Sequence, residues 1–147
     1  MINPLEFSER EEVISMSFIE IKGLSKIFLQ GNQKIYGIRN ANLSIDKGTF
    51  MSVIGRSGSG KSTFLNLVGG IENPTSGEVF FDGKSIHQFK DKELTKFRNQ
   101  HIGYVFQQYH LLKELTVLEN IRLPLDIGRK AYDHSYEEEL LDLLGLK

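Results

Sequence analysis

The apolar residues in the first third of the chain follow the pattern of short strands separated by turns. Residues 16–29 are rich in β-branched and aromatic side chains, and the dipeptide Gly31-Asn32 separates them from a second strand-like run over 38–45. Residues 50–54 are apolar at nearly every position, which is typical of a strand buried on both faces of a parallel sheet. The pattern predicts a hairpin followed by a buried parallel strand.

A helical period begins after residue 60. Phe64, Leu65 and Val68 fall on one stripe of a helix that we expect to end near Gly69. This switch from a strand pattern to a helix pattern, across a short glycine-rich loop, is typical of α/β proteins.

Further strand and helix signals follow. The dipeptide Asp82-Gly83 predicts a second hairpin, residues 90–100 form a polar stretch with helical character, and residues 102–106 predict a second short apolar strand. We expect the two apolar strands, 50–54 and 102–106, to belong to the interior of the protein.

Two more helices are predicted near the end of the chain. Thr116 and Ser135 each precede a glutamate by three residues, which is the spacing of a capping box. Pro124 is expected to limit the first of these helices, and Gly145 to cap the second at its end.

Composition narrows the class of protein. The chain has 147 residues, which fits one domain, and its 18 basic and 19 acidic residues nearly cancel, so charge gives no case for a nucleic-acid partner. The chain has no cysteine, which excludes disulfides and thiolate metal sites. Residues 1–15 are acidic without a signal-peptide pattern, so we expect a cytoplasmic domain over 16–147 after a short extension, with Met16 as an alternative start.

One loop carries the candidate chemistry. Residues 55–62, GRSGSGKS, match the phosphate-binding pattern G-x-x-x-x-G-K-[ST] in full. A loop at the start of a helix offers unpaired backbone N–H groups and the positive end of the helix dipole, which suit a triphosphate. The flanking strand and helix patterns exclude a flexible linker, and Thr63 stands where a Rossmann turn needs glycine. We assign phosphate binding to Gly55, Arg56, Ser57, Gly58, Ser59, Gly60, Lys61, Ser62 and Thr63.

Each residue type in the loop has an expected role. The three glycines are expected to adopt positive φ angles that turn N–H groups inward. Lys61 is expected to reach the β- and γ-phosphates, Ser62 to ligate Mg²⁺, and Thr63 to bond the α-phosphate. Arg56 is given no catalytic role.

Together with other segments, the loop resembles the ATP-binding subunits of ABC transporters over residues 18–147. NPTSGEVFFDG is similar to the segment after the first helix of that family, and IGYVFQQYHLLKELTVLENIRLPL to its Q-loop and the start of its helical subdomain. The sequence of these segments most resembles the branch of the family that serves lipoprotein release, macrolide export and antimicrobial-peptide export. The resemblance implies an α/β fold: a P-loop core half, an antiparallel β-layer and the beginning of a helical subdomain, incomplete at the C-terminus.

The resemblance also implies site residues and partners. Phe28 falls where the family stacks an aromatic ring on adenine, and Gln107 falls on the Q-loop glutamine that joins Ser62 in holding Mg²⁺ with ATP. The alternative for Phe28 is an aromatic side chain packed in the core, and the alternative for Gln107 is a surface glutamine without a role in binding. The implied partners are a membrane-spanning permease and a second ATP-binding subunit in a head-to-tail dimer, which places the protein on the inner face of the cell membrane.

Several parts of the family's hydrolysis machinery do not occur in this sequence. After Gln107 there is no SGGQ signature and no apolar strand ending in Asp-Glu, and the resemblance places these parts, with the switch histidine, beyond Lys147. We therefore expect ATP binding without hydrolysis by this chain alone, and marginal stability because strand edges are left unpaired. A degenerate nucleotide-binding module and a non-functional truncation stay open as alternatives.

Overall fold

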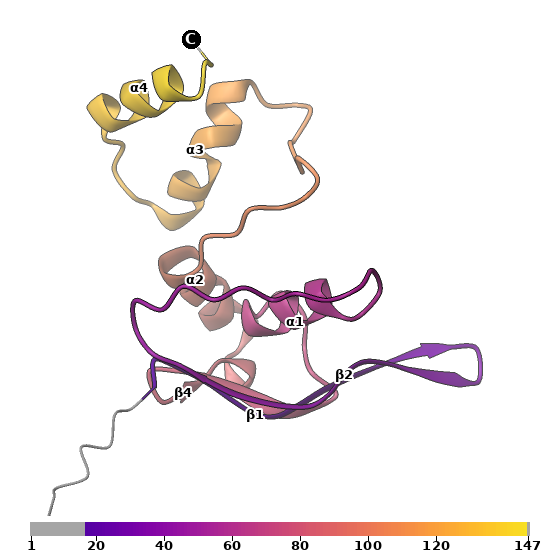
Figure 1. Cartoon of the computed structure of the whole chain (residues 1–147). Helices are drawn as coiled ribbons and strands as arrows, with labels where there is room; N and C mark the ends of the chain where they lie inside the picture. The colour runs from indigo at the N-terminus through magenta and orange to yellow at the C-terminus, as the bar shows by residue number, and fades with distance from the viewer. Residues whose placement is uncertain (1–16, 147) are drawn as a thin grey trace, which may run out of the picture. The chain divides into compact units, whose positions relative to one another are not determined.

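The computed structural model describes residues 17–146 and divides them into two compact units (Figure 1). The sheet unit contains residues 17–64 and 74–86, and the helical unit contains residues 65–73 and 87–146. The predicted extension at 1–15 and the alternative start at Met16 lie outside the described residues.

The sheet unit is built on a four-stranded antiparallel sheet with the order β2-β1-β3-β4. Its strands are β1 (Ile19–Gln30), β2 (Gln33–Ile45), β3 (Ser76–Phe81) and β4 (Lys84–Ser85). Both predicted hairpins are confirmed, because β1 and β2 turn at Gly31-Asn32 and β3 and β4 turn at Asp82-Gly83. Gly31 has a φ of +59° and Gly83 a φ of +72°, values that a glycine adopts without strain.

The core of the sheet unit lies on one face of β1 and β3. The buried side chains there are Ile21, Leu24, Phe64, Val79, Phe81 and Ile86. The Phe18 and Phe81 rings meet edge to face with centroids 5.9 Å apart. A β-carbon added to Gly77 would stand 2.3 Å from the carbonyl oxygen of Gly23, so the close approach of β3 to β1 requires a glycine.

The two predicted apolar strands do not form. Residues 50–54 and 102–106 join no strand ladder, and the side chains of Phe50, Ile54 and Val105 are 94%, 91% and 98% exposed. A strand is defined by hydrogen bonds to a neighbour, and the sheet of the described residues offers neither segment such a neighbour. Apolar composition alone was therefore insufficient to predict a strand, and the predictions of strands at 50–54 and 102–106 were wrong for this chain. Marginal stability stays a prediction.

The helix that follows the loop is α1 (Lys61–Val68), which starts in the sheet unit and ends in the helical unit. Its predicted stripe was partly wrong, because Leu65 is exposed and Leu67 is fully buried. Its predicted end is confirmed. The N–H of Gly70 (φ +64°) donates to the Leu67 carbonyl and that of Ile71 to the Asn66 carbonyl, a Schellman ending.

Three longer helices form the rest of the helical unit. They are α2 (Asp91–His101), α3 (Val117–Gly128) and α4 (His134–Leu143), and the short 3₁₀ turn η1 (Ile86–Gln88) precedes them. The predicted polar helix at 90–100 corresponds to α2. The capping box of α3 is confirmed: the Glu119 N–H donates to Thr116 Oγ1, and the Thr116 N–H donates to the Glu119 carboxylate.

Two predictions about helix ends were wrong. Pro124 lies inside α3, which gives up one backbone hydrogen bond there and continues to Gly128. The N-cap of α4 is Asp133, whose carboxylate accepts from the Tyr136 N–H at 3.1 Å, so Ser135 lies inside the helix. The predicted ending of α4 is confirmed, since Gly145 (φ +66°) follows its last turn and its N–H donates to the Asp142 carbonyl.

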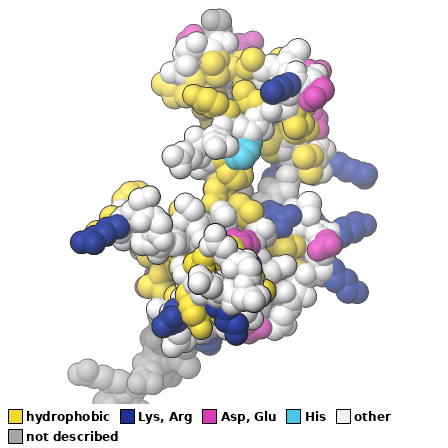
Figure 2. Space-filling view, turned by 90° about the vertical axis from the view of Figure 1, so that its right-hand side faces the viewer, with side chains coloured by type: hydrophobic (Ala, Val, Ile, Leu, Met, Phe, Trp, Pro, Cys, Tyr) yellow, Lys and Arg dark blue, Asp and Glu magenta, His cyan; other side chains and the backbone are white. Residues whose placement is uncertain are grey.

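The helical unit leaves much apolar surface uncovered. Figure 2 shows hydrophobic side chains gathered over its upper part, and the exposed ones on α3 and α4 include Ile121, Ile127, Tyr136 and Leu143. A hollow of about 370 Å³ lies among side chains of α3 and α4. No helix of residues 17–146 has both the length and the apolar character that crossing a bilayer requires.

Candidate nucleotide-binding site

The loop at 55–60 owes its shape to its glycines. Gly58 and Gly60 have φ angles of +74° and +91°, as predicted. The same prediction was wrong for Gly55, which is not in the positive-φ region. Gly55 is needed for space instead, because a β-carbon there would stand 2.7 Å from Ser59 Oγ. The Ser59 N–H donates to the Arg56 carbonyl at 3.2 Å, which closes a tight turn within the loop.

Lys61 reaches back across this loop. Its Nζ donates to the carbonyl oxygens of Gly55 and Arg56 at 2.9 and 2.7 Å. Two of the three ammonium N–H groups thus bind the loop itself. The positive charge is held at the curve of the loop, where an incoming anion would meet it, and the sequence prediction for Lys61 is consistent with this position.

The first turn of α1 provides the backbone donors. The first helical hydrogen bond runs from the Phe64 N–H to the Gly60 carbonyl at 2.8 Å. The N–H groups of Lys61, Ser62 and Thr63 precede that bond, so they have no acceptor within the helix. The first turn contains no acidic side chain that would compete with an anion. These donors, the helix dipole and the Lys61 ammonium fit a phosphate group.

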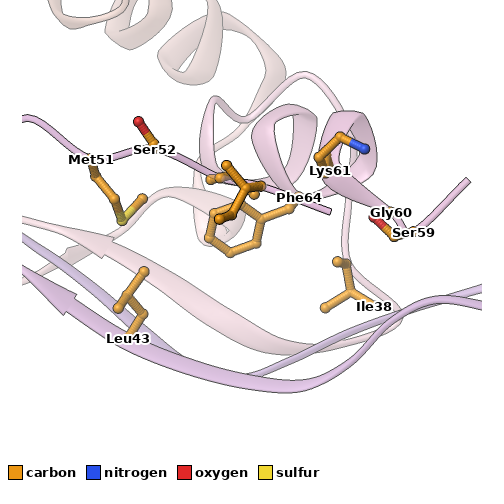
Figure 3. Close-up of a pocket in the computed structure, with 10 residues that line it drawn as sticks. Ile38, Leu43, Met51, Ser52, Ser59, Gly60, Lys61 and Phe64 are labelled. Atoms are coloured by element: carbon orange, nitrogen blue, oxygen red, sulfur yellow. The ribbon is translucent and has the colours of Figure 1, made fainter. Parts of the chain in front are cut away.

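An apolar cavity of about 400 Å³ lies beside the loop (Figure 3). Ile38 and Leu43 of β2 line it from one side, Met51 and Ile54 from the segment before the loop, and Phe64 from α1. Ser59, Gly60 and Lys61 of the loop also line it. Because apolar walls do not suit phosphate oxygens, we assign the phosphates to the loop and its N–H groups.

Phe28 lies next to the loop in space. Its side chain, on β1, is 39% exposed. A β-carbon built on Gly37 would stand 2.7 Å from Phe28 Cε2 and 3.2 Å from Thr63 Cγ2, so the ring edge and the threonine methyl both border Gly37. The structure thus brings together the aromatic residue and the last loop residue that the sequence predicted separately.

Gly37 itself was missed at the sequence level. It meets the loop as well, because a β-carbon on Gly60 would stand 2.1 Å from the Gly37 carbonyl oxygen. The signal that was available was a lone glycine directly before the predicted run at 38–45, because a glycine within a strand often marks a bulge or a close backbone approach.

Gln107 belongs to the helical unit, whereas the loop belongs to the sheet unit. Its side chain is exposed in a bend that follows Phe106, whose ring lies 4.5 Å from the Tyr104 ring, centroid to centroid. The Tyr104 hydroxyl is 2.6 Å from Asn66 Oδ1, which ties this segment to α1. The two units are not placed relative to one another, so the role of Gln107 at magnesium stays a prediction.

A charged cluster joins α3 to α4 within the helical unit. The Arg122 guanidinium donates twice to the Glu137 carboxylate, at 2.7 and 2.6 Å, and lies 5.0 Å from the centre of the Tyr132 ring. The paired guanidinium holds the pKa of Glu137 below its ordinary value. The Tyr132 hydroxyl donates to Asp126, which raises the pKa of Tyr132. These groups pair with one another, so we assign them a structural role.

Several known proteins are similar to this chain in sequence. The family model of the ABC transporter matches residues 38–147. The lipoprotein-releasing system ATP-binding protein LolD of Colwellia psychrerythraea is 45% identical over 125 residues, which are 84% of this chain and 48% of that protein. The macrolide export ATP-binding/permease protein MacB of Mannheimia succiniciproducens is 40% identical over 133 residues, 89% of this chain and 21% of that protein.

A solved structure shows the same fold. It is a dimer of the ATP-binding cassette MJ0796 of Methanocaldococcus jannaschii in a post-hydrolysis state with ADP and Pi, and it is 43% identical with a TM-score of 0.74. The match covers 82% of this chain and 53% of that one. The chain thus spans about half the length of LolD and of this cassette. Its α/β fold is that of a cassette fragment, and the chain belongs to the ABC transporter family of ATP-binding proteins.

Proposed function

We propose that this chain binds Mg-ATP as the energy-coupling part of an ABC transporter. One observation carries the proposal: the Lys61 ammonium and the free N–H groups of the first turn of α1 converge on one loop, and Phe28 stands beside its last residue. The family match over residues 38–147 includes the loop and α1 and supports this part of the site.

In the proposed complex the nucleotide is held at three places. The N–H groups from Gly58 to Thr63 cradle the phosphates, and Lys61 leaves its two carbonyl partners to neutralise the β- and γ-phosphates. Ser62 and Gln107 ligate Mg²⁺ together with phosphate oxygens. The adenine stacks on the ring of Phe28, whose side chain is 39% exposed.

We propose a permease and a second ATP-binding subunit as partners. MacB, which this chain resembles, is described as an ATP-binding/permease protein, and the similar cassette MJ0796 is dimeric. These partners would hold the chain at the inner face of the cell membrane. Closure of two such subunits over ATP would then drive the permease.

We also propose that the chain of 147 residues leaves the γ-phosphate intact. Phosphoryl transfer needs a group that orients the attacking water and more charge stabilisation than one loop supplies. The present sequence spans about half of its relatives and has no apolar strand ending in Asp-Glu. Steady ATP turnover by the pure chain, abolished in Lys61→Ala, would contradict this part of the proposal.

The binding site is tested by titrating the chain with Mg-ATP in a calorimeter. We expect Lys61→Ala to weaken ATP affinity at least about tenfold, because it removes a charge-assisted contact to the phosphates. The matched control is Lys47→Ala, which removes the same charge from an exposed turn of the same unit and is expected to bind as the wild type does. Equal affinities of Lys61→Ala and the wild type would contradict the proposed site.

A further inference from the structure

The register between β1 and β2 breaks beside the loop. Lys26 pairs with Ile38 and Ile27 pairs with Tyr36, so Gly37 is an extra residue of β2 with no counterpart on β1. Such bulges re-aim nearby side chains and are frequent next to binding sites. On β2, the bulge residue Gly37 is next to Tyr36, the partner of Ile27. The following pair joins Phe28 to Ile35.

Three elements meet at this bulge, and two of them border the space that a side chain on Gly37 would occupy. The ring edge of Phe28 and the methyl group of Thr63 stand 2.7 and 3.2 Å from the place of a β-carbon on Gly37. On the other side, the backbone of Gly60 packs against the Gly37 carbonyl so closely that a β-carbon on Gly60 would be 2.1 Å from its oxygen. The bulge therefore contacts both the aromatic ring and the end of the phosphate loop.

We propose that Gly37 is a positioning residue that sets the distance between the Phe28 ring and the phosphate loop, and so governs how the planar base of a nucleotide stacks. The inference rests on the proposed function. A β-carbon on Gly37 pushes the ring away from Thr63, because the ring edge is the nearer and more movable of its two neighbours. The Thr63 methyl group, at 3.2 Å, has to move by only a few tenths of an ångström, so we expect the N–H donors of α1 to keep their positions.

The test separates the base from the phosphates. Wild type, Gly37→Ala, Phe28→Ala and the double variant are titrated with Mg-ATP and with tripolyphosphate, which has no base. We expect Phe28→Ala to weaken ATP affinity about tenfold, within the range of a lost base–aromatic stack, and Gly37→Ala to weaken it about three- to fivefold. Tripolyphosphate affinity is expected to stay unchanged in all of them.

Coupling between the two positions is the second readout. The double variant is expected to bind ATP no more weakly than Phe28→Ala, because a ring that is absent cannot be displaced. Gly103→Ala is the matched control, since a β-carbon there meets nothing within 4 Å, and its ATP affinity is expected to equal that of the wild type.

Several outcomes would overturn the inference. They are an unchanged ATP affinity in Gly37→Ala, equal losses for ATP and tripolyphosphate, or losses that add in the double variant. If Gly37→Ala does not fold, the double variant must fold, because it lacks the crowding ring; a double variant that is also unfolded overturns the inference. If the wild type binds neither ATP nor tripolyphosphate, the proposed function is wrong as well. This result distinguishes a failure of the proposed function from a failure of the inference about Gly37.

Discussion

The phosphate loop and the segment just before it are neighbours in sequence, yet only one of them adopts its predicted structure. The loop is held by contacts within six residues: Lys61 to the carbonyls of Gly55 and Arg56, and Phe64 to Gly60. Residues 50–54 are as apolar as a buried strand, but they join no ladder and Ile54 is 91% exposed. Short-range hydrogen bonds form wherever the local sequence permits, whereas a strand needs a second segment from elsewhere in a fold.

The largest effect is expected where the loop meets β2. Gly60→Ala places a β-carbon 2.1 Å from the Gly37 carbonyl oxygen at a φ of +91°, so the free energy of unfolding should fall by about 3 kcal/mol. Gly58→Ala is the matched control. Its φ is +74° but a β-carbon there meets nothing within 4 Å, so it bears backbone strain alone, about 1 kcal/mol.

Urea denaturation of the two variants measures this difference. Equal losses in Gly60→Ala and Gly58→Ala would show that the loop is shaped by its own backbone only, and that its contact with the bulge of β2 contributes nothing.

A purely local interaction should give a smaller loss. Thr116→Ala removes the N-cap of α3 and is expected to lower the free energy of unfolding by about 1 kcal/mol. Ser135→Ala is the control, because Asp133 caps α4 and the change should stay within about 0.5 kcal/mol. A larger loss for Ser135→Ala than for Thr116→Ala would reverse the assignment of the two caps.

The ion pair between Arg122 and Glu137 in the helical unit should make the stability depend on pH in the acid range. The pKa of Glu137 is lowered by Arg122, so the pair stabilises the fold above the ordinary glutamate pKa, and that contribution is lost as the pH falls through the lowered value. In Glu137→Gln the acid-induced loss of stability should therefore be shallower than in the wild type. The control is Glu138→Gln, which removes the same charge from an exposed site of α4 and should retain the wild-type dependence of the melting temperature on pH. If Glu137→Gln also has the wild-type dependence, the proposed role of the ion pair is wrong.

The smallest effect is expected in the segment that failed to become a strand. Ile54→Ser should change the free energy of unfolding by no more than about 0.5 kcal/mol, because the side chain is already 91% exposed. Phe64→Ala, in the core of the sheet unit, should cost about 3 kcal/mol and serves as the comparison. A loss above about 2 kcal/mol in Ile54→Ser would mean that residues 50–54 are packed as the sequence predicted.

The predictions that held share a physical basis. Both hairpins, the end of α1 and the capping box of α3 depend on residues a few positions apart, such as Gly31-Asn32 or Thr116 with Glu119. The prediction for Ser135 was wrong because Asp133, two residues earlier, caps α4 in its place. The prediction for Pro124 was wrong because α3 continues through the proline with the loss of one hydrogen bond.

The sequence by itself determined the phosphate loop, its lysine and the helix that follows, because a glycine pattern and a helix start fix which N–H groups are free. It also placed Phe28 on a strand. Only the tertiary structure decided that Phe28 lies beside Thr63 and that Gly37 is the point where they meet. That juxtaposition depends on a bulge in the pairing of two strands, and strand register is set by contacts between segments that the pattern of either segment alone does not contain.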